Sequence, residues 1–394
     1  MIDLIKSRAK AHFEQLVQIR RHLHANPELS FNEHQTAVFV LKTLCDYGID
    51  AKPHSETGVV ALISGELGEA KEVTALRADL DALPIHEENE VDYRSTKDRV
   101  MHACGHDVHT TSLLGTAMIL YDLKSKFSGT VKLIFQPGEE KLPGGASLMI
   151  KNGILQNPKP GHIIGQHVFP ELEVGKVGFR SGKYMASCDE IYLKVLGKGG
   201  HGALPHKNID PILIASHIVV AMQQIISRRS DATIPSVLSF GRIIGEGATN
   251  VIPDQVSLDG TFRTYDEKWR LEAHKLIEKL AKSTAEAMGG KCEVNIVKGY
   301  PFVKNDPDLT AIARSLAESY LGKENVIELD MRPTGEDFSY YTQEMPGTFY
   351  RLGVRNEKKG IIYPVHSSRF DVDEKSIEIG CGLMAWLAIN NLKQ

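Results

Sequence analysis

The 394-residue sequence lacks the features that mark membrane-spanning and nucleic-acid-binding proteins. No uninterrupted apolar run reaches the roughly 18–20 residues that span a bilayer, so we expect no membrane partner. Lys and Arg number 46 against 50 for Asp and Glu, and a chain without excess positive charge is not expected to bind nucleic acid. Aromatic residues make up only 7%, which disfavours a platform for stacking bases.

Cysteine is also scarce and scattered. Its five residues are odd in number and far apart in the chain, unlike the even, closely spaced set of a disulfide framework. The first ten residues carry charges from the third position onward, so they lack the apolar stretch of a signal peptide. We therefore expect a soluble, cytoplasmic protein.

The remaining composition is that of a globular protein, with 42% hydrophobic and 24% charged residues. A chain of this length is expected to form two or three domains. Short apolar runs typical of buried strands occur at 59–63, 73–76 and 131–135, and apolar residues recur at helical spacing over 37–47 and 109–121. This alternation predicts an α/β catalytic domain with a mostly parallel sheet, formed by residues 1–185 and 299–394.

Residues 186–298 follow a different order. Strand patterns near 190–196, 236–243, 256–264 and 292–298 enclose helical patterns near 211–228 and 269–288. The order β-α-β-β-α-β is that of the ferredoxin-like fold. We therefore predict an inserted α+β domain that serves as a lid or as a dimerisation domain.

Two polar clusters in the larger domain indicate metal chemistry. Cys104 and His106 lie two residues apart, so in an extended loop a thiolate and an imidazole point the same way, as in half of a metal site. Glu139 and Glu140 follow the apolar run 131–135, and the carboxyl ends of parallel strands are where α/β proteins bind ligands. One of these carboxylates can bind a metal ion while the other acts as general base.

Three further candidates, Asp79, His167 and His366, lie in the same domain. Alone, each of the two histidines is more typical of a structural residue, whereas for Asp79 a structural and a functional role are about equally expected. Asp79 and His167 follow predicted strands, so convergence at one sheet edge decides the interpretation. Asp79 is a candidate to orient a ligand from behind. Five ligands are more than one tetrahedral ion needs, which suggests two divalent ions. The five predicted ligands are Cys104, His106, Glu140, His167 and His366. Their mixed S, N and O character suits Mn²⁺ or Zn²⁺ and also admits Co²⁺ or Ni²⁺.

The inserted domain contributes three candidates of its own. His201 lies between glycines, where a histidine can donate to a developing oxyanion. Asn250 and Arg263 are candidates for binding a substrate carboxylate, because an amide donates and a guanidinium offers a bidentate fork.

With these motifs in this order, the sequence resembles the metal-dependent aminoacylase and carboxypeptidase G superfamily of amidohydrolases. Within it, the sequence is most similar to the branch of hippurate hydrolase, N-acyl-L-amino acid amidohydrolase and auxin-conjugate (IAA-amino acid) hydrolase. The resemblance covers essentially the whole chain, through residues 20–29, 77–79, 102–107, 136–140, 199–202, 250–253, 336–338 and 366.

The resemblance implies roles at the matching positions. Glu139 is implied to be the general base, and Asp79 is implied to orient the site. The five candidate ligands named above are implied to bind the metal ions. His201 is implied to reach into the active site of a neighbouring subunit and stabilise the oxyanion, which would require a homodimer built through the inserted domain.

The implied activity is hydrolysis of the amide bond of N-acyl-L-amino acids, with acetyl, benzoyl or similar acyl groups, to a carboxylic acid and a free amino acid. The alternatives within the superfamily are a dipeptidase or carboxypeptidase and an N-acetyl-diaminopimelate deacetylase. Many relatives have a metal-binding His where this chain has Arg77, and a bridging Asp where it has the Cys104 cluster; both differences fit the narrower branch.

Two further function classes are disfavoured by the residues themselves. A binding protein with a vestigial site has no need of the carboxylate pair Glu139 and Glu140. A thiolate ligand such as Cys104 is unusual in a phosphoesterase or nuclease.

Overall fold

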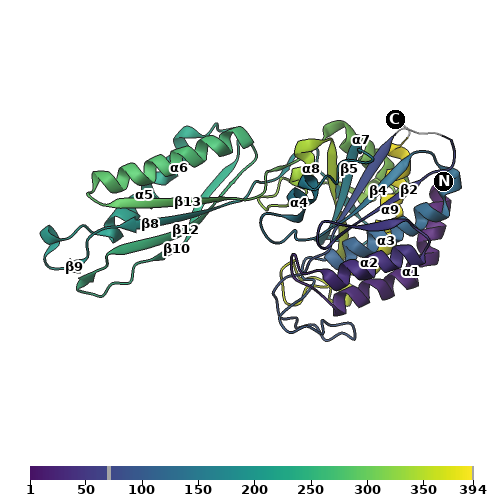
Figure 1. The fold of residues 1–394 in the computed structure, drawn as a ribbon, viewed down its shortest axis with the longest axis horizontal. Coiled ribbons are helices and arrows are strands. Elements are labelled where there is room, and N and C mark those ends of the chain that lie inside the picture. The colour runs from purple at the N-terminus through teal and green to yellow at the C-terminus, as the bar shows by residue number, and fades with distance from the viewer. Residues whose placement is uncertain (69–71, 393–394) are drawn as a thin grey trace. The chain divides into compact units, whose positions relative to one another are not determined.

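The computed structural model describes residues 1–68 and 72–392. It divides into two compact units, of which the larger comprises Met1–Gly182, Lys304–Asp330 and Asp337–Gln394 and the inserted one comprises Lys183–Val303 and Met331–Glu336 (Figure 1). The segment Met331–Glu336 was not predicted to belong to the inserted domain. It joins the inserted unit because Arg332 N donates to Tyr184 O at 2.8 Å and Arg332 O accepts from Ala186 N at 3.1 Å.

The larger unit is built on an eight-stranded sheet of order β1-β2-β4-β3-β5-β16-β6-β15. The run β4-β3-β5-β16 is parallel, as is the pair β6–β15, whereas β1–β2, β2–β4 and β16–β6 are antiparallel. The predicted α/β fold with a mostly parallel sheet is confirmed. In chain order the strands are β1 (Ala51–His54), β2 (Gly58–Ser64), β3 (Val73–Asp79), β4 (Thr130–Gln136), β5 (His162–Glu173), β6 (Val177–Phe179), β15 (Val326–Glu328) and β16 (Gly347–Arg355).

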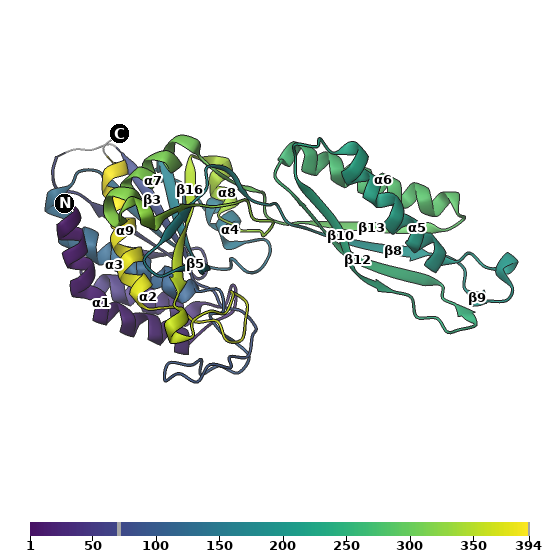
Figure 2. The same cartoon turned by 180° about the vertical axis from the view of Figure 1, so that it is seen from behind.

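Helices cover this sheet in layers. The helices α3 and α9 pack against each other and against strands of the sheet, and α1 packs on both of them (Figure 2). This arrangement buries α3 almost completely, so that even its Thr116 hydroxyl is buried and donates to Ser112 O and Cys381 O. The helices of this unit are α1 (Ile2–Ala25), α2 (His34–Asp46), α3 (His106–Asp122), α4 (Gly145–Lys151), α7 (Pro307–Leu321), α8 (Ser339–Glu344) and α9 (Lys375–Asn391).

The register of the parallel strands defines one edge of the sheet. Asp79, the last residue of β3, lies opposite Gln136, the last residue of β4. Arg77 lies opposite Gly165 in β5, so the level of Asp79 is also the level of His167, two residues further along. The segment that follows β4 therefore starts beside Asp79 and His167, where the sequence placed the metal site.

The inserted unit has the ferredoxin-like order β8-α5-β10-β12-α6-β13. Its four strands pair in the order β10-β12-β8-β13, all antiparallel, and α5 and α6 pack together on them (Figure 1). Asp210 and Asp266 cap the two helices. The elements are β8 (Asp189–Leu196), β9 (Gly200–His201), α5 (Pro211–Gln224), β10 (Ser236–Ile244), β11 (Val251–Ile252), β12 (Gln255–Thr264), α6 (Glu267–Ala287) and β13 (Lys291–Lys298), and β7 (Gly182–Met185) pairs with β14 (Val303–Asn305).

One helical stretch of this unit differs from the expectation of no membrane-spanning segment. Pro211–Arg229, which is α5 and the turn after it, is apolar and long enough to cross a membrane by length and composition alone, and 33% of it is buried. Its inner face, with Ile214, Ile218 and Met222, belongs to the core of the inserted unit. Its outer face exposes Leu213 and Val220, at 51% and 74%.

A buried ion pair fastens α6 to β8. Arg270 Nε donates to Asp189 Oδ2 at 2.9 Å, and His274 Nε2 lies 2.7 Å from the same oxygen. Burial alone would raise the pKa of Asp189, but the hydrogen bonds from Arg270 and His274 outweigh it and lower the pKa to about 2. Because the folded pKa is below the usual value, this stabilisation is present above pH ~4 and is lost as the pH falls from ~4 toward ~2, an effect of about 2 kcal/mol.

We predict that Asp189→Asn destabilises the inserted unit by roughly 3 kcal/mol at pH 7, because it removes the buried ion pair with Arg270 and leaves that guanidinium with Glu267 as its ionic partner. The difference from wild type should narrow between pH 5 and pH 2. Urea unfolding followed by Trp269 fluorescence, in a Trp386→Phe background, measures this in the inserted unit. Asp259→Asn, which removes a surface pair with Arg242, is the control and should cost less than about 0.5 kcal/mol. If the difference in unfolding free energy between the wild type and Asp189→Asn does not change with pH, the lowered pKa assigned to Asp189 is wrong.

Candidate active site

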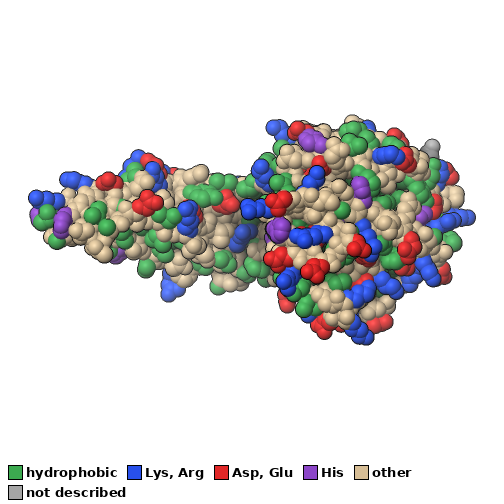
Figure 3. All heavy atoms as spheres, turned by 90° about the horizontal axis from the view of Figure 1, so that it is seen from below, with side chains coloured by type: hydrophobic (Ala, Val, Ile, Leu, Met, Phe, Trp, Pro, Cys, Tyr) green, Lys and Arg blue, Asp and Glu red, His purple; other side chains and the backbone are tan. Residues whose placement is uncertain are grey.

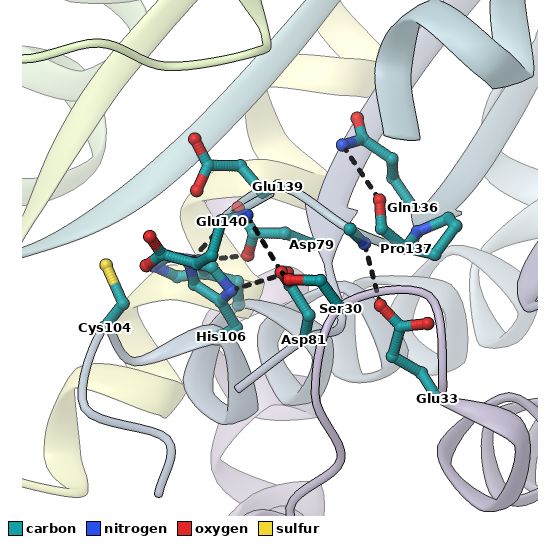
Figure 4. Close-up of polar contacts among 12 residues, drawn as sticks. Ser30, Glu33, Asp79, Asp81, Cys104, His106, Gln136, Pro137, Glu139 and Glu140 are labelled. Carbon is teal, nitrogen blue, oxygen red and sulfur yellow. Dashed lines mark hydrogen bonds and ion pairs between the residues drawn. The ribbon is translucent and has the colours of Figure 1, made fainter. Parts of the chain in front are cut away.

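The structure brings the five predicted metal ligands together at the sheet edge described above. Donor atoms of Cys104, His106 and His167 lie within 4.8 Å of one another, as do those of Cys104, Glu140 and His366. Cys104 Sγ is 3.4 Å from His167 Nε2, and His366 Nε2 is 3.2 Å from Glu140 Oε1. The five side chains thus form one connected cluster, drawn in part in Figure 4.

The loop that carries Cys104 and His106 needs its glycine. Gly105 has a φ of +80°, and a Cβ there would lie 2.5 Å from Val168 Cγ2. The glycine lets the chain turn into α3 directly beside β5. His366, from the loop before α9, is tied to this loop because its N–H donates to Ala103 O at 2.7 Å.

His106 is oriented by a carboxylate that the sequence analysis did not single out. Its Nδ1 lies 3.1 Å from Asp81 Oδ1. Its buried Nε2 has no hydrogen-bond partner among the described residues and is 3.8 Å from Asp79 Oδ2. Burial would lower the pKa of His106, but Asp79, Asp81 and Glu140 together raise it to about 10. The imidazole therefore lies in strongly negative surroundings.

Asp79 contacts the cluster mainly through a second histidine. Its Oδ1 is 2.6 Å from His109 Nδ1, and His109 Nε2 accepts from Val168 N at 2.8 Å. Both ring nitrogens of His109 are occupied by hydrogen bonds, with the proton on Nδ1, so this histidine supports the site and is not a candidate ligand. Through it, Asp79 fixes the backbone next to His167.

Arg77, in β3, forms ion pairs with two buried carboxylates. Its Nη1 is 2.5 Å from Asp79 Oδ2 and its Nη2 is 2.6 Å from Asp337 Oδ1. Gln136 bridges Arg77 and Asp337, because its Oε1 accepts from Arg77 Nε at 2.9 Å and its Nε2 donates to Asp337. Burial raises the pKa of Asp337 to about 6 against the opposing effect of Arg77.

Glu139, the predicted general base, is next to this network. Only 6% of it is exposed, and its Oε1 accepts from Asp337 N at 3.4 Å. Donor atoms of His106, Glu139 and Glu140 also lie within 4.8 Å of one another. The neighbouring turn is held by Asp81, whose Oδ2 accepts from Glu140 N at 2.9 Å.

The inserted unit separates its three predicted residues into two places. His201 and Asn250 are neighbours, since Gly202 N donates to Asn250 O at 2.8 Å in the small ribbon of β9 and β11. Arg263 is at the other end of β12, where its Nε donates to Thr261 Oγ1. Eight residues of strand separate Gln255 from Arg263, about 26 Å. Within one chain, Asn250 and Arg263 therefore do not bind the same carboxylate.

Comparison with known proteins agrees with this geometry. Residues 75–390 match the family described as peptidase family M20/M25/M40. The chain belongs to this family. The chain is 38% identical over 393 residues to thermostable carboxypeptidase 2 of Saccharolobus solfataricus, covering 99% of this chain and 98% of the relative. It is 42% identical over 287 residues to the N-acyl-L-amino acid amidohydrolase of Geobacillus stearothermophilus, covering 73% and 76%.

The structure of a dinuclear metal-binding M20 peptidase from Bacillus subtilis superposes with a TM-score of 0.84 at 34% identity, covering 98% of this chain and 99% of that one. The predicted amidohydrolase resemblance is confirmed, and this M20 protein is a metal-dependent hydrolase of amide bonds.

The donor set of this chain fits divalent ions. The unpartnered Nε2 of His106 faces the cluster. Burial, together with the carboxylates of Glu140 and Glu139, raises the pKa of the Cys104 thiol well above its usual value. Divalent cations would compensate this concentration of acidic groups and favour the thiolate.

Proposed function

We propose that this M20 hydrolase cleaves the amide bond of N-acyl-L-amino acids and releases a carboxylic acid and a free amino acid. The observation that supports it best is the arrangement of Glu139, a buried carboxylate beside the five-donor cluster and outside the proposed ligand set. We propose that Cys104, His106, Glu140, His167 and His366 hold two divalent ions, Mn²⁺ or Zn²⁺, with Co²⁺ or Ni²⁺ as substitutes. Such ions supply polarisation of the amide carbonyl and acidification of water.

The residues of the chain divide the proton transfers. Glu139 removes a proton from the attacking water as the new C–O bond forms, and it delivers that proton to the amide nitrogen as the C–N bond breaks. Asp337 N–H, at 3.4 Å, orients its carboxylate. His201 donates a hydrogen bond to the developing oxyanion. Its Nδ1 accepts from Ala203 N at 3.1 Å, which leaves the proton on Nε2 for this purpose.

We further propose that His201 acts in the active site of a second copy of the chain. The inserted unit offers a surface for such a dimer, because β10 is an edge strand of its sheet and α5 packs beside it. Exposed apolar side chains, green in Figure 3, occur along this unit, and on these two elements they are Ile212, Leu213, Val220, Val237 and Ile243. A second copy that covers them accounts for the apolar outer face of α5 without a membrane.

A homodimer also gives Asn250 and Arg263 compatible roles. Asn250 is next to His201 and would enter the partner's site with it, while Arg263 would bind the substrate carboxylate in another site. The length of β12 that lies between them, about 26 Å from Gln255 to Arg263, supports their belonging to two different active sites.

The second candidate function is that of a carboxypeptidase, because a carboxypeptidase is 38% identical over nearly the full chain. The two candidates differ in whether the group on the carbonyl side of the scissile amide is a plain acyl group or an aminoacyl group with its own charge. A substrate panel separates them.

The test measures amino acid release by metal-stripped enzyme, with and without Mn²⁺ or Zn²⁺. The substrates are N-acetyl-L-methionine, hippurate and a matched set of dipeptides. We expect release from the N-acyl amino acids only after metal is added, at a higher kcat/KM than from dipeptides. Faster cleavage of dipeptides would favour the carboxypeptidase. No release from any substrate, by folded protein that binds the ions, would contradict both.

A further inference from the structure

The loop between α1 and α2 lies directly against the turn that carries Glu139 (Figure 4). Glu33 occupies the N-cap position of α2, but its side chain does not cap that helix. Glu28 does so instead, because its carboxylate accepts from Gln35 N at 3.2 Å and from Thr36 N at 2.8 Å. The carboxylate of Glu33 is thereby available for contacts outside its own helix.

Those contacts lead to the residue before Glu139. Gly138 N donates to Glu33 Oε1 at 2.8 Å, Phe31 N donates to the same oxygen at 2.9 Å, and Thr57 Oγ1 donates to Oε2 at 2.7 Å. Glu33 is fully buried, and burial raises the pKa of its carboxyl group. Because an unpartnered buried polar group is costly, three donors on one carboxylate indicate a site built around it.

The turn fits closely against this loop. Gly138 has a φ of +61°, and a Cβ there would lie 2.2 Å from Cε1 of Phe31. On the following residues the turn is held by Asp81, which accepts from Glu140 N at 2.9 Å and from Ser30 Oγ at 2.6 Å. Neighbouring residues of the same loop, Ser30 to Glu33, thus act on the turn directly or through Asp81.

We propose that Glu33 is a positioning residue for Glu139: its carboxylate fixes the Gly138 amide and so sets where the general base lies relative to the metal ligands. This role depends on the length of the Glu33 side chain and on one oxygen that accepts from two N–H groups, and not on the negative charge of the carboxylate. The proposal rests on the proposed function of Glu139 and adds a residue that contacts neither the substrate nor the ions.

Two conservative variants separate position from charge. Glu33→Gln keeps the length of the side chain, so its amide oxygen still accepts from Gly138 and Phe31 while its NH₂ donates to the Thr57 hydroxyl. Glu33→Asp keeps the charge but is shorter by one methylene, about 1.5 Å, and does not reach all three donors. Thr57→Val is the matched control, because it removes one hydrogen bond from the same carboxylate without touching the turn.

The variants are compared as metal-loaded full-length enzyme, with N-acetyl-L-methionine, after metal content and thermal unfolding are measured. We expect Glu33→Asp to lower kcat by roughly 10- to 100-fold, the effect of misplacing a catalytic group by about 1 Å, with KM changed less than about threefold. Glu33→Gln should retain kcat within about threefold with the acid limb of the pH profile unmoved, and Thr57→Val should retain it within about twofold.

Either of two results would overturn the proposal: Glu33→Asp as active as wild type, or Glu33→Gln at least as impaired as Glu33→Asp at equal metal content. The second would show that the charge of Glu33 is required, so that shape alone does not carry its role. Glu139→Gln is assayed in parallel on the same substrate. If it stays active, the proposed function fails; if it is inactive while Glu33→Asp is normal, only the positioning role fails.

Discussion

Glu139→Gln is expected to lower kcat by about 10²- to 10⁴-fold, the range in which general acid–base groups contribute. The amide has the same shape as the carboxylate, and its oxygen still accepts from Asp337 N, but it does not take a proton from water. Because Glu139 is outside the proposed ligand set, the variant should bind the same amount of metal as the wild type. Amide hydrolysis and elemental analysis of the purified protein measure the two properties.

Glu140→Gln is the matched control for this experiment. Both glutamates lie within reach of His106, so the geometry alone allows the ligand and the base to be exchanged. We assign Glu140 as the ligand because its Oε1 is 3.2 Å from His366 Nε2 and its carboxylate lies within 4.8 Å of the donor atoms of Cys104 and His366. We therefore expect Glu140→Gln to lose metal as well as activity. The reverse pattern, with metal lost from Glu139→Gln, would show that the two roles are exchanged.

The convergence of several candidate site residues could be predicted from the sequence because it depends on one topological rule. Asp79, Glu139 and Glu140 follow apolar strands, and the carboxyl ends of parallel strands meet at one edge. The register of β3, β4 and β5 places these segments side by side. A similar rule identified the inserted unit, because the spacing of its strands and helices matches one known motif.

The residues that support the site could not be predicted in the same way. His109 is near His106 in sequence and Asp81 is near Asp79, yet nothing in their spacing indicates that His109 binds Asp79 and that Asp81 binds His106. Arg77 and Asp337 are 260 residues apart, and Glu33 is 105 residues from Gly138. Such pairs are formed by tertiary packing, and the pattern of apolar residues in a single segment does not indicate which distant segment will pack against it.

Helix α1 escaped prediction for a related reason. Its charged side chains interrupt the apolar pattern. Its buried residues, which include Ile5, Ala9, Leu16 and Leu23, are identified only from the packing of α3 and α9 against it. Short strands such as β6 and β15, of three residues each, carry too few positions for any periodicity.

His201→Ala is expected to lower kcat by about 10²- to 10³-fold, the loss seen when one oxyanion donor is removed, with a smaller effect on KM. The exposed His206 on the same loop provides the control, and His206→Ala should change kcat by less than about twofold. An unchanged kcat in His201→Ala would remove the oxyanion role.

Mixing the two inactive variants tests where His201 acts. If it serves the partner's site, a mixed dimer of Glu139→Gln and His201→Ala has one site with both groups intact and one with neither. Random reassembly makes half of the dimers mixed, with one working site in each, so activity should recover to about a quarter of the wild-type value. If His201 serves its own chain's site, every site in the mixture lacks one group and activity stays at the sum of the parents. Because the Glu139→Gln chain contributes only its histidine, recovery would also establish that the dimer is required for catalysis.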